Sequence, residues 1–310
     1  MGRIKNIALA STVRAEYQEL ACFIKHYQAI GVDVIILFFD DPNDSCIKRI
    51  RDNFQAVILI KCDDAYWKAR GIKKPDSIEE RQTVNVNEAL NIGTIKGSKW
   101  LVNVDVDELV YCEHDLKKAL ENYENEEIDA VRFDVLEAVP EKAYYASIFE
   151  PTLFRANPSE KRIALAKALG CSSVLFNGEY FRGHLASKLA IRVSSNVSRI
   201  KIHNVEMKKG EAAIVRAKHI LLLHFDSIGV HNWQQKWDRR VDGTGKASEM
   251  RGNRKKQLDF YLQAKKGGPK VIERSYLKLY GINFFQKRLL LLLGMLQIIN
   301  LKEKHVTDSV

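Results

Sequence analysis

The feature that most constrains the fold of this chain is the alternation of short apolar runs with amphipathic segments in its first third. Four apolar runs have the length and composition of buried strands, at 4–10, 32–39, 56–62 and 99–112. Three amphipathic segments between them predict helices, at 16–31, 46–54 and 77–97. Because strands and helices alternate, we predict an α/β fold with a doubly wound, mostly parallel sheet.

The rest of the chain is different in character. Strand-like runs cover 127–139 and 217–225, and from Asn232 onward the sequence is basic and helical. We therefore predict two parts, a domain over 1–231 and a helical, basic C-terminal region over 232–310.

The charge of the chain is unevenly distributed. Lys and Arg number 49 and Asp and Glu 39, which gives a net charge of +10. Residues 236–288 contain 15 basic and 5 acidic side chains, so this segment accounts for the whole excess. A segment of this charge is expected to meet an anionic partner.

Cysteine content and the N-terminus bear on the cellular compartment. The five cysteines are odd in number and no two form a Cys-x-x-Cys pair, which favours a reduced protein without a cysteine zinc site. The first 17 residues contain neither a long apolar run nor a cleavage pattern, so we expect no signal peptide. The expected location is the cytoplasm.

The tail, residues 284–305, contains an apolar run at 289–299 that has two interpretations. The run is shorter than the roughly 20 residues that a spanning helix needs. Basic residues at both ends of the tail would allow it to lie in an anionic membrane interface, on the inner face of the plasma membrane. Alternatively, the run is a C-terminal helix that packs on the core.

Polar stretches follow two of the predicted strands. Residues 40–45 come after the second strand, and residues 105–108 come at the end of the fourth. Ligands of doubly wound sheets bind beyond the carboxyl ends of the strands. Both stretches are therefore expected to face one crevice.

Three carboxylates, Asp105, Asp107 and Glu108, end the fourth apolar run. Buried carboxylates need a cation or hydrogen-bond donors. In an extended chain Asp105 and Asp107 point to the same side, and two close carboxylates favour a divalent cation. Oxygen ligands in an incomplete shell suit Mn²⁺ or Mg²⁺. The alternative is that these acids cap the next predicted helix, at 114–124, for which Asp115 is better placed.

The stretch "WLVNVDVDELV" (100–110) resembles the acidic signature of glycosyltransferases with the GT-A fold, in particular family 2-like enzymes and family 92. Residues 13–45 are similar to the opening of that group, although Ala15 stands where the family usually has Asn. The positions in register there are His26, Tyr27, Gly31, Asp33, Asp41, Asn43 and Ser45. Downstream, 183–193 and 219–237 are similar to two further segments of the family.

The resemblance implies a Rossmann-like GT-A fold in residues 1–231. It implies an inverting, hexosyltransferase-type enzyme that uses a nucleotide-sugar donor, in particular a UDP-sugar. The implied acceptor is a glycan or a lipid-linked molecule in the synthesis of cell-surface polysaccharide, lipopolysaccharide or capsule. The residues that it implies for the nucleotide sugar are Ala10, Ser11, Thr12, Arg14, Asp41, Arg81, Gln82, Asp105, Lys188 and Lys236. The first three would belong to the loop after the first strand. The two lysines, with Arg192, would contact phosphates; the alternative is that these three are solvated surface charges.

For the metal, the resemblance implies Asp107 as the principal direct ligand, with Asp105 facing the sugar or ribose or reaching Mn²⁺ or Mg²⁺ through water. His224 is a further candidate ligand, because a neutral imidazole complements carboxylates; the alternative is a structural histidine bonded to a backbone carbonyl. Glu179 and Asp226 are the candidate general bases for the acceptor hydroxyl. Glu179 is preferred, because its neighbours in "FNGEYF" are apolar and aromatic.

Three other classes of protein are alternatives. A nucleic-acid-binding protein would use the basic segment, with interleaved aromatic residues stacking on bases: Trp233, Trp237, Tyr261 and Tyr276. That function leaves the acidic signature without a role, so we expect no nucleic-acid partner. A nucleotidyltransferase would share the paired acids, but "DGTGKAS" (242–248) lacks the spacing of a phosphate-binding loop. A sugar-binding module without turnover is the third.

Overall fold

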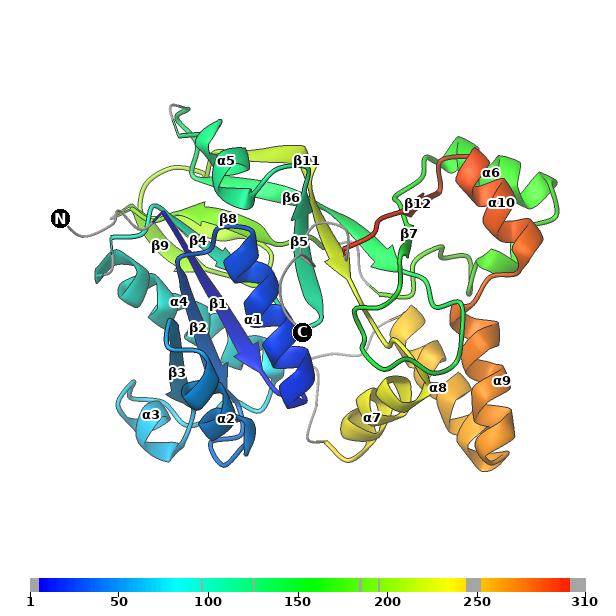
Figure 1. Ribbon diagram of the computed structural model, residues 1–310, viewed down its shortest axis with the longest axis horizontal. Coiled ribbons are helices and arrows are strands. Elements are labelled where there is room, and N and C mark those ends of the chain that lie inside the picture. The colour runs from blue at the N-terminus through cyan, green and yellow to red at the C-terminus, as the bar shows by residue number, and fades with distance from the viewer. Residues whose placement is uncertain are drawn as a thin grey trace. The chain divides into compact units, whose positions relative to one another are not determined.

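The computed structural model of the chain describes residues 6–95, 97–124, 126–183, 186–194, 196–243 and 252–301 (Figure 1). Contacts divide the chain into two compact units, each built from two separate stretches of sequence. The first unit is Met1–Asp134 with Ala186–Leu222, and the second is Val135–Leu185 with Leu223–Val310. The predicted boundary after residue 231 follows a change in composition and stays a prediction. Residues 244–251 and 302–310 of the predicted C-terminal region lie outside the described residues.

The first unit contains most of the strands. In chain order its elements are β1 (Ile7–Val13), α1 (Tyr17–Ala29), β2 (Val34–Phe39), α2 (Cys46–Asn53), β3 (Val57–Lys61), α3 (Asp64–Lys68), α4 (Ile78–Ile95), β4 (Trp100–Asn103), β5 (Glu108–Cys112), α5 (Leu116–Glu121), β8 (Leu189–Arg192), β9 (Val197–Ile200) and β10 (Val205–Met207). Two more strands, β6 (Ala130–Ala138) and β11 (Ile214–His224), contribute residues to both units.

Four parallel strands form the centre of the first unit, in the order β3-β2-β1-β4, which can be followed in Figure 1. β8 pairs antiparallel with β4, and Ala130–Arg132 of β6 pair antiparallel with β8. β5 pairs with β11. The prediction of an α/β fold with a mostly parallel central sheet and helices is confirmed.

Burial explains why these segments form strands. β2 lies between two strands and all its side chains are buried, whereas the side chains of β3, which ends the strand order, are half-buried or exposed. α4 covers one face of the sheet, where Val86 and Ala89 join the same core as Ala8 and Ala10 of β1. The small alanine side chains allow the helix to pack closely on this strand.

The second unit is mainly helical. Its elements are β7 (Leu153–Arg155), α6 (Glu160–Ala168), the 3₁₀ turn η1 (Ser172–Val174), α7 (Val230–Val241), α8 (Asn253–Lys266), α9 (Pro269–Tyr280), α10 (Phe284–Leu292) and β12 (Leu296–Ile298). β12 pairs antiparallel with β7, which pairs antiparallel with the end of β6.

Aromatic side chains form the core between α7, α8 and α9. Trp233, Trp237, Tyr261 and Tyr276 are fully buried there, together with Tyr280. The first four are the residues that a nucleic-acid-binding protein would use for stacking, and burial makes them inaccessible to a base. That part of the alternative is wrong: the aromatic residues of the basic segment build its core.

The apolar run at 289–299 is neither a single helix nor wholly buried. α10 ends at Leu292, Gly294 turns the chain with a φ of 62°, and β12 then pairs with β7. Leu290 and Leu296 join the core under this segment. Within the part of the chain that the structure describes, no helix has both the length and the apolar composition required to cross a bilayer.

Candidate functional site

The acidic turn, which we define as residues 104–107, lies between two strands. The predicted strand 99–112 is split here, because β4 ends at Asn103 and β5 begins at Glu108. The buried Glu108 carboxylate closes the turn, since its Oε2 accepts the backbone N–H of Asp105 at 2.8 Å. Glu108 therefore shapes the turn that carries the two aspartates.

The acids of this turn do not cap the helix that follows. α5 begins after Asp115, and the Asp115 Oδ1 accepts the backbone N–H of Lys118 at 2.7 Å. The alternative role for the acidic turn as a helix cap is therefore wrong, and Asp115 has that role.

Asp105 is held by two side chains from distant parts of the sequence. Gln82 Nε2, on α4, donates to Oδ1 at 2.7 Å, and Lys188 Nζ lies 3.0 Å from Oδ2. Lys188 Nζ also lies 3.8 Å from Glu108 Oε2. Burial by itself would lower the pKa of Lys188, but the Asp105 and Glu108 carboxylates raise it above its ordinary value. The Lys188 ammonium is thus a buried cation that belongs to the acidic turn.

Helix α1 fixes the strand that leaves the acidic turn. The buried Tyr27 hydroxyl donates to the carbonyl oxygen of Glu108 at 2.9 Å and accepts the N–H of Val110 at 3.1 Å. His26 Nε2 lies 2.8 Å from the carbonyl oxygen of Val110. The His-Tyr pair therefore anchors β5 to α1 and limits how far the acidic turn can move.

A second charged group lies at the carboxyl end of β2. The buried Asp40 Oδ1 is 3.0 Å from Arg81 Nε, on α4, and 3.3 Å from Lys74 Nζ. Asp41, the residue that the sequence singled out, is exposed and its Oδ1 accepts the N–H of Asn43 at 2.9 Å. Sequence reasoning missed Asp40, although the adjacent pair of aspartates signals that one of them ends the buried strand.

The predicted loop after the first strand is part of the strand. β1 extends past Ala10, Ser11 and Thr12, so the prediction that put them in a loop is wrong. Ala10 is a core residue and Ser11 is buried. The Thr12 Oγ1 accepts an N–H of Asn85 on α4 at 2.8 Å, while Arg14 is exposed just beyond the strand.

His203 was not singled out from the sequence but lies near the acidic turn. It is half-buried between β9 and β10, and its Nδ1 is 3.1 Å from the carbonyl oxygen of Ser187, the neighbour of Lys188. Burial and the Lys188 charge lower the pKa of His203. No sequence signal links it to the turn, because the two are far apart in the chain.

Arg192, which was expected to contact phosphates, bonds to the protein instead. Its guanidinium lies 4.7 Å from the centre of the Trp100 ring. It donates to the carbonyl oxygens of Tyr123 at 2.6 Å and Ile128 at 2.9 Å. These bonds tie the end of β8 to the chain segment before β6.

In the second unit, Asp226 is fully buried and paired with two cations. Lys236, on α7, donates to its Oδ1, and Arg254 NH2, on α8, lies 2.9 Å from its Oδ2. Burial alone would raise the pKa of Asp226, but the Lys236 and Arg254 charges hold it well below its ordinary value. Asp226 and Lys236 were predicted to act on substrates, and here they join α7 to α8.

His224, at the end of β11, lies in a crowded ionic cluster. A Cβ at Gly183 would lie 3.0 Å from Glu137 Oε1 and 3.1 Å from the His224 ring, closer than side chains normally approach. The Glu137 carboxylate also accepts the N–H of Arg182 and pairs with Arg155 NH1 at 2.9 Å. The role of His224 as a metal ligand stays a prediction.

Glu179 lies at a tight turn on the surface of the second unit. Asn177 and Gly178 both have positive φ values, 50° and 85°, and Phe176 and Glu179 exchange backbone hydrogen bonds across them. The Glu179 side chain is exposed and accepts an N–H of Asn253 at 2.9 Å. The apolar setting expected from its sequence neighbours is therefore absent at the carboxylate.

The residues of the acidic turn suit a metal only in a limited way. Both oxygens of Asp105 have partners in Gln82 and Lys188. The half-buried Asp107 is the other aspartate of this turn. No group of three or more His, Cys, Asp or Glu side chains among the described residues is arranged to hold a metal. One carboxylate completed by water and substrate phosphates is a normal environment for Mg²⁺. Asp107 fits that kind of site.

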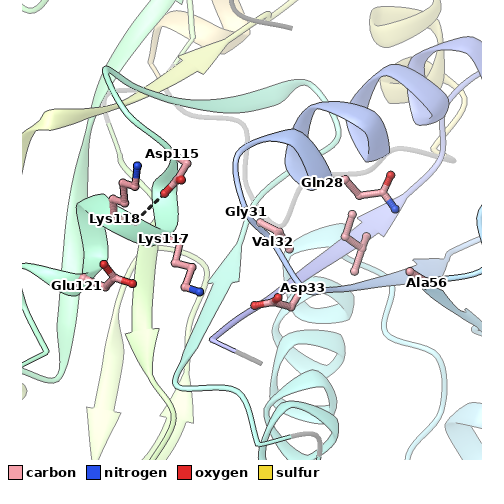
Figure 2. Close-up of a pocket in the computed structure, with 10 residues that line it drawn as sticks. Gln28, Gly31, Val32, Asp33, Ala56, Asp115, Lys117, Lys118 and Glu121 are labelled. Atoms are coloured by element: carbon pink, nitrogen blue, oxygen red, sulfur yellow. Dashed lines mark hydrogen bonds between the residues drawn. The ribbon is translucent and has the colours of Figure 1, made fainter. Parts of the chain in front are cut away.

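A pocket of about 580 Å³ lies elsewhere in the first unit, at the amino end of β2 (Figure 2). Two of the three acids that line it, Asp33 and Asp115, accept hydrogen bonds from backbone N–H groups. Asp33 Oδ2 accepts the N–H of Asn6 at 2.8 Å, and Asp115 caps α5 by accepting the N–H of Lys118, the dashed line in Figure 2. The pocket contains none of the predicted site residues, so the carboxyl ends of β2 and β4 are the candidate site.

Three comparisons with known proteins bear on this site. A model of glycosyltransferase family 92 matches residues 10–258. The crystal structure of HddC from Yersinia pseudotuberculosis is similar over 74% of this chain and 97% of its own, with 10% sequence identity and a TM-score of 0.37. That likeness is too distant to assign a function. No curated protein matches the sequence.

Proposed function

The chain belongs to glycosyltransferase family 92, and we propose that it moves a hexosyl group from a UDP-sugar to a glycan or lipid-linked acceptor with inversion. The observation that carries the proposal is the acidic turn, in which Asp105 is held by Gln82 and Lys188 beside Asp107. A GT-A fold and synthesis of a cell-surface polysaccharide at the cytoplasmic face of a membrane are parts of the same proposal.

We assign donor binding to side chains at the carboxyl ends of β1, β2 and β4. Asp40, Asp41 and Arg81 would border the nucleoside, because carboxylates accept hydrogen bonds from ribose and base. Lys188 and Gln82 hold Asp105 in one orientation, so that it presents a fixed acceptor to the ribose or the sugar. Pre-orientation of this kind lowers the ordering cost of binding.

The proposed metal is Mn²⁺ or Mg²⁺, with Asp107 as its protein ligand. When bound, the cation would act as a Lewis acid that neutralises the charge growing on the departing diphosphate. The Lys188 charge is already balanced by Asp105 and Glu108, and it is therefore not counted as a phosphate ligand. A site with one protein carboxylate makes metal affinity depend on the donor, because the nucleotide supplies the remaining oxygen ligands.

Inversion requires a base that takes the proton of the acceptor hydroxyl while its oxygen bonds to the anomeric carbon and the bond to the diphosphate breaks. Of the two candidates, Glu179 is better suited, because its carboxylate is exposed. The buried, doubly paired Asp226 is a weak base, since its pKa lies well below the ordinary value. Glu179→Gln should lower kcat with little change in KM for the donor.

The test is titration of the full chain with UDP, with and without Mn²⁺, by calorimetry. We expect metal-dependent binding that Asp107→Asn abolishes without lowering Tm. The matched control is Asp52→Asn, which removes the same charge from an exposed aspartate on α2. Absence of metal-dependent binding by UDP and by other sugar-donor nucleotides, or unchanged binding by Asp107→Asn, would contradict the proposal.

Transfer itself is followed with a panel of nucleotide sugars. Slow hydrolysis of one donor identifies the sugar that the site accepts. The anomeric configuration of the product, read by NMR, distinguishes inversion from retention.

A further inference from the structure

Helix α10 (Phe284–Leu292), in the second unit, exposes large apolar side chains. Phe284 is 71% exposed, Phe285 62% and Leu292 85%. The opposite side of the helix is anchored, because Gln286 and Leu290 are buried. Contiguous exposed apolar side chains are uncommon on soluble surfaces and mark places where a partner binds.

The exposed side chains of α10 lie on one face. An α-helix turns by about 100° per residue, so Phe284, Arg288, Leu292 and Phe285 fall within roughly 100° of one another around the axis. The Arg288 guanidinium lies 4.7 Å from the centre of the Phe284 ring. The face therefore combines three apolar side chains with a cation placed among them.

Helix α6 packs beside α10. It shares a core with α10, in which Ile163 and Ala166 of α6 pack with Leu290, and Figure 1 shows the two helices next to each other. At the junction, a Cβ on Gly294 would lie 3.3 Å from Arg162 NH1. Two more leucines are exposed here: Leu165 of α6, at 47%, and Leu169, the residue that follows the helix, at 45%.

The charges around these apolar side chains are mainly positive. The stretch 283–301 contains Lys287 and Arg288 and no carboxylate. α6 has one acid, Glu160, against three basic residues: Lys161, Arg162 and Lys167. Lys287 is balanced by Glu141 at 2.5 Å, but the other basic residues have exposed side chains. The surface of α6 and α10 is therefore apolar and cationic.

We propose that the α6–α10 surface, defined as Leu165, Leu169, Phe284, Phe285, Arg288 and Leu292, docks on an anionic lipid bilayer. Apolar side chains enter the interface while the basic residues meet the lipid head groups, as in peripheral amphipathic helices. A second copy of the chain is a poor occupant, because like charges would face each other. The proposal rests on the membrane-side location given in the proposed function and assigns a surface to it, and it is independent of donor binding.

The test is co-sedimentation of the full chain with vesicles, without nucleotide or metal. Vesicles of phosphatidylcholine that contain roughly a third phosphatidylglycerol represent the anionic surface, and pure phosphatidylcholine is the neutral comparison. We expect the chain to bind the anionic vesicles, and we expect this binding to weaken at high salt. The double variant Phe285→Ser/Leu292→Ser should reduce the partition coefficient at least tenfold, and Arg288→Gln should reduce its salt dependence.

All three substituted side chains are exposed, so the variants should fold, which far-UV circular dichroism and Tm check. Ile72→Ser, at an exposed apolar residue of the first unit, is the matched control and should bind as the unaltered chain does. Three results would overturn the proposal: no binding to anionic vesicles, equal binding by the double variant, or self-association in solution that the double variant abolishes without any vesicle binding. Because no nucleotide is present, the outcome is separate from that of the UDP titration.

Discussion

Replacement of Lys188 by Met removes the buried cation of the acidic turn and leaves the shape of the side chain nearly unchanged. At an effective dielectric constant of about 20, the 3.0 Å contact with Asp105 corresponds to an attraction of roughly 5.5 kcal/mol and the 3.8 Å contact with Glu108 to roughly 4.4 kcal/mol. Desolvation of the three charges offsets most of this attraction. The measured cost of removing one partner of a buried pair is about 3–5 kcal/mol.

A loss of this size is a large part of the 5–15 kcal/mol that is typical of folded proteins. With about 2–4 °C per kcal/mol for a unit of this size, Tm should fall by roughly 6–20 °C. Differential scanning calorimetry measures the fall in Tm, and urea denaturation measures the loss of unfolding free energy. The matched control is Lys99→Met: its ammonium lies 2.7 Å from Glu124 but is 45% exposed, so the loss should be at most about 1 kcal/mol.

A double-mutant cycle isolates the pair. Lys188→Met combined with Asp105→Asn should cost less than the two single changes added together, with a coupling above about 1 kcal/mol. Because the pKa of Lys188 is raised, its contribution is complete below the unfolded value of about 10.4 and disappears only as pH rises through the higher folded value. The reasoning is refuted if Lys188→Met and Lys99→Met lower Tm equally, or if the cycle is additive.

Two further substitutions test the second unit. Asp226→Asn should destabilise it by about 3–5 kcal/mol, because Lys236 and Arg254 lose their buried partner. Folding lowers the pKa of Asp226, so the stability that its charge contributes is lost as pH falls below the unfolded value of about 3.9. The difference in urea midpoint between the variant and the unaltered chain should therefore shrink on acidification. A midpoint difference that grows on acidification would contradict this. Gly183→Ala should lower the free energy of unfolding by about 1–3 kcal/mol, because the new Cβ would lie 3.0 Å from the Glu137 carboxylate. The loss is read as a lower Tm. An unchanged Tm would show that the neighbouring side chains move aside at no cost and would contradict the prediction.

The periodicity of the sequence was sufficient to predict the elements of the parallel sheet. The apolar run of β2 and the capping signal before α4 are local, so these elements lie close to their predicted positions. The excess positive charge of residues 236–288 follows from composition, and the pair Asp105 and Asp107 from its spacing after an apolar run. The same local information did not predict the structure of the tail, where Gly294 turns the chain between α10 and β12.

The sequence by itself determined the α/β class and the presence of a carboxylate-rich turn after a buried strand, because hydrophobic periodicity and residue type are local properties. Only the tertiary structure decided which charges are neutralised. It placed Lys188 on Asp105, chose Asp40 rather than Asp41 for burial beside Arg81, and enclosed Asp226 between two cations. The physical reason is that the energy of a charge depends on burial and on partners that folding brings from far along the chain, and neither can be known from neighbours in sequence.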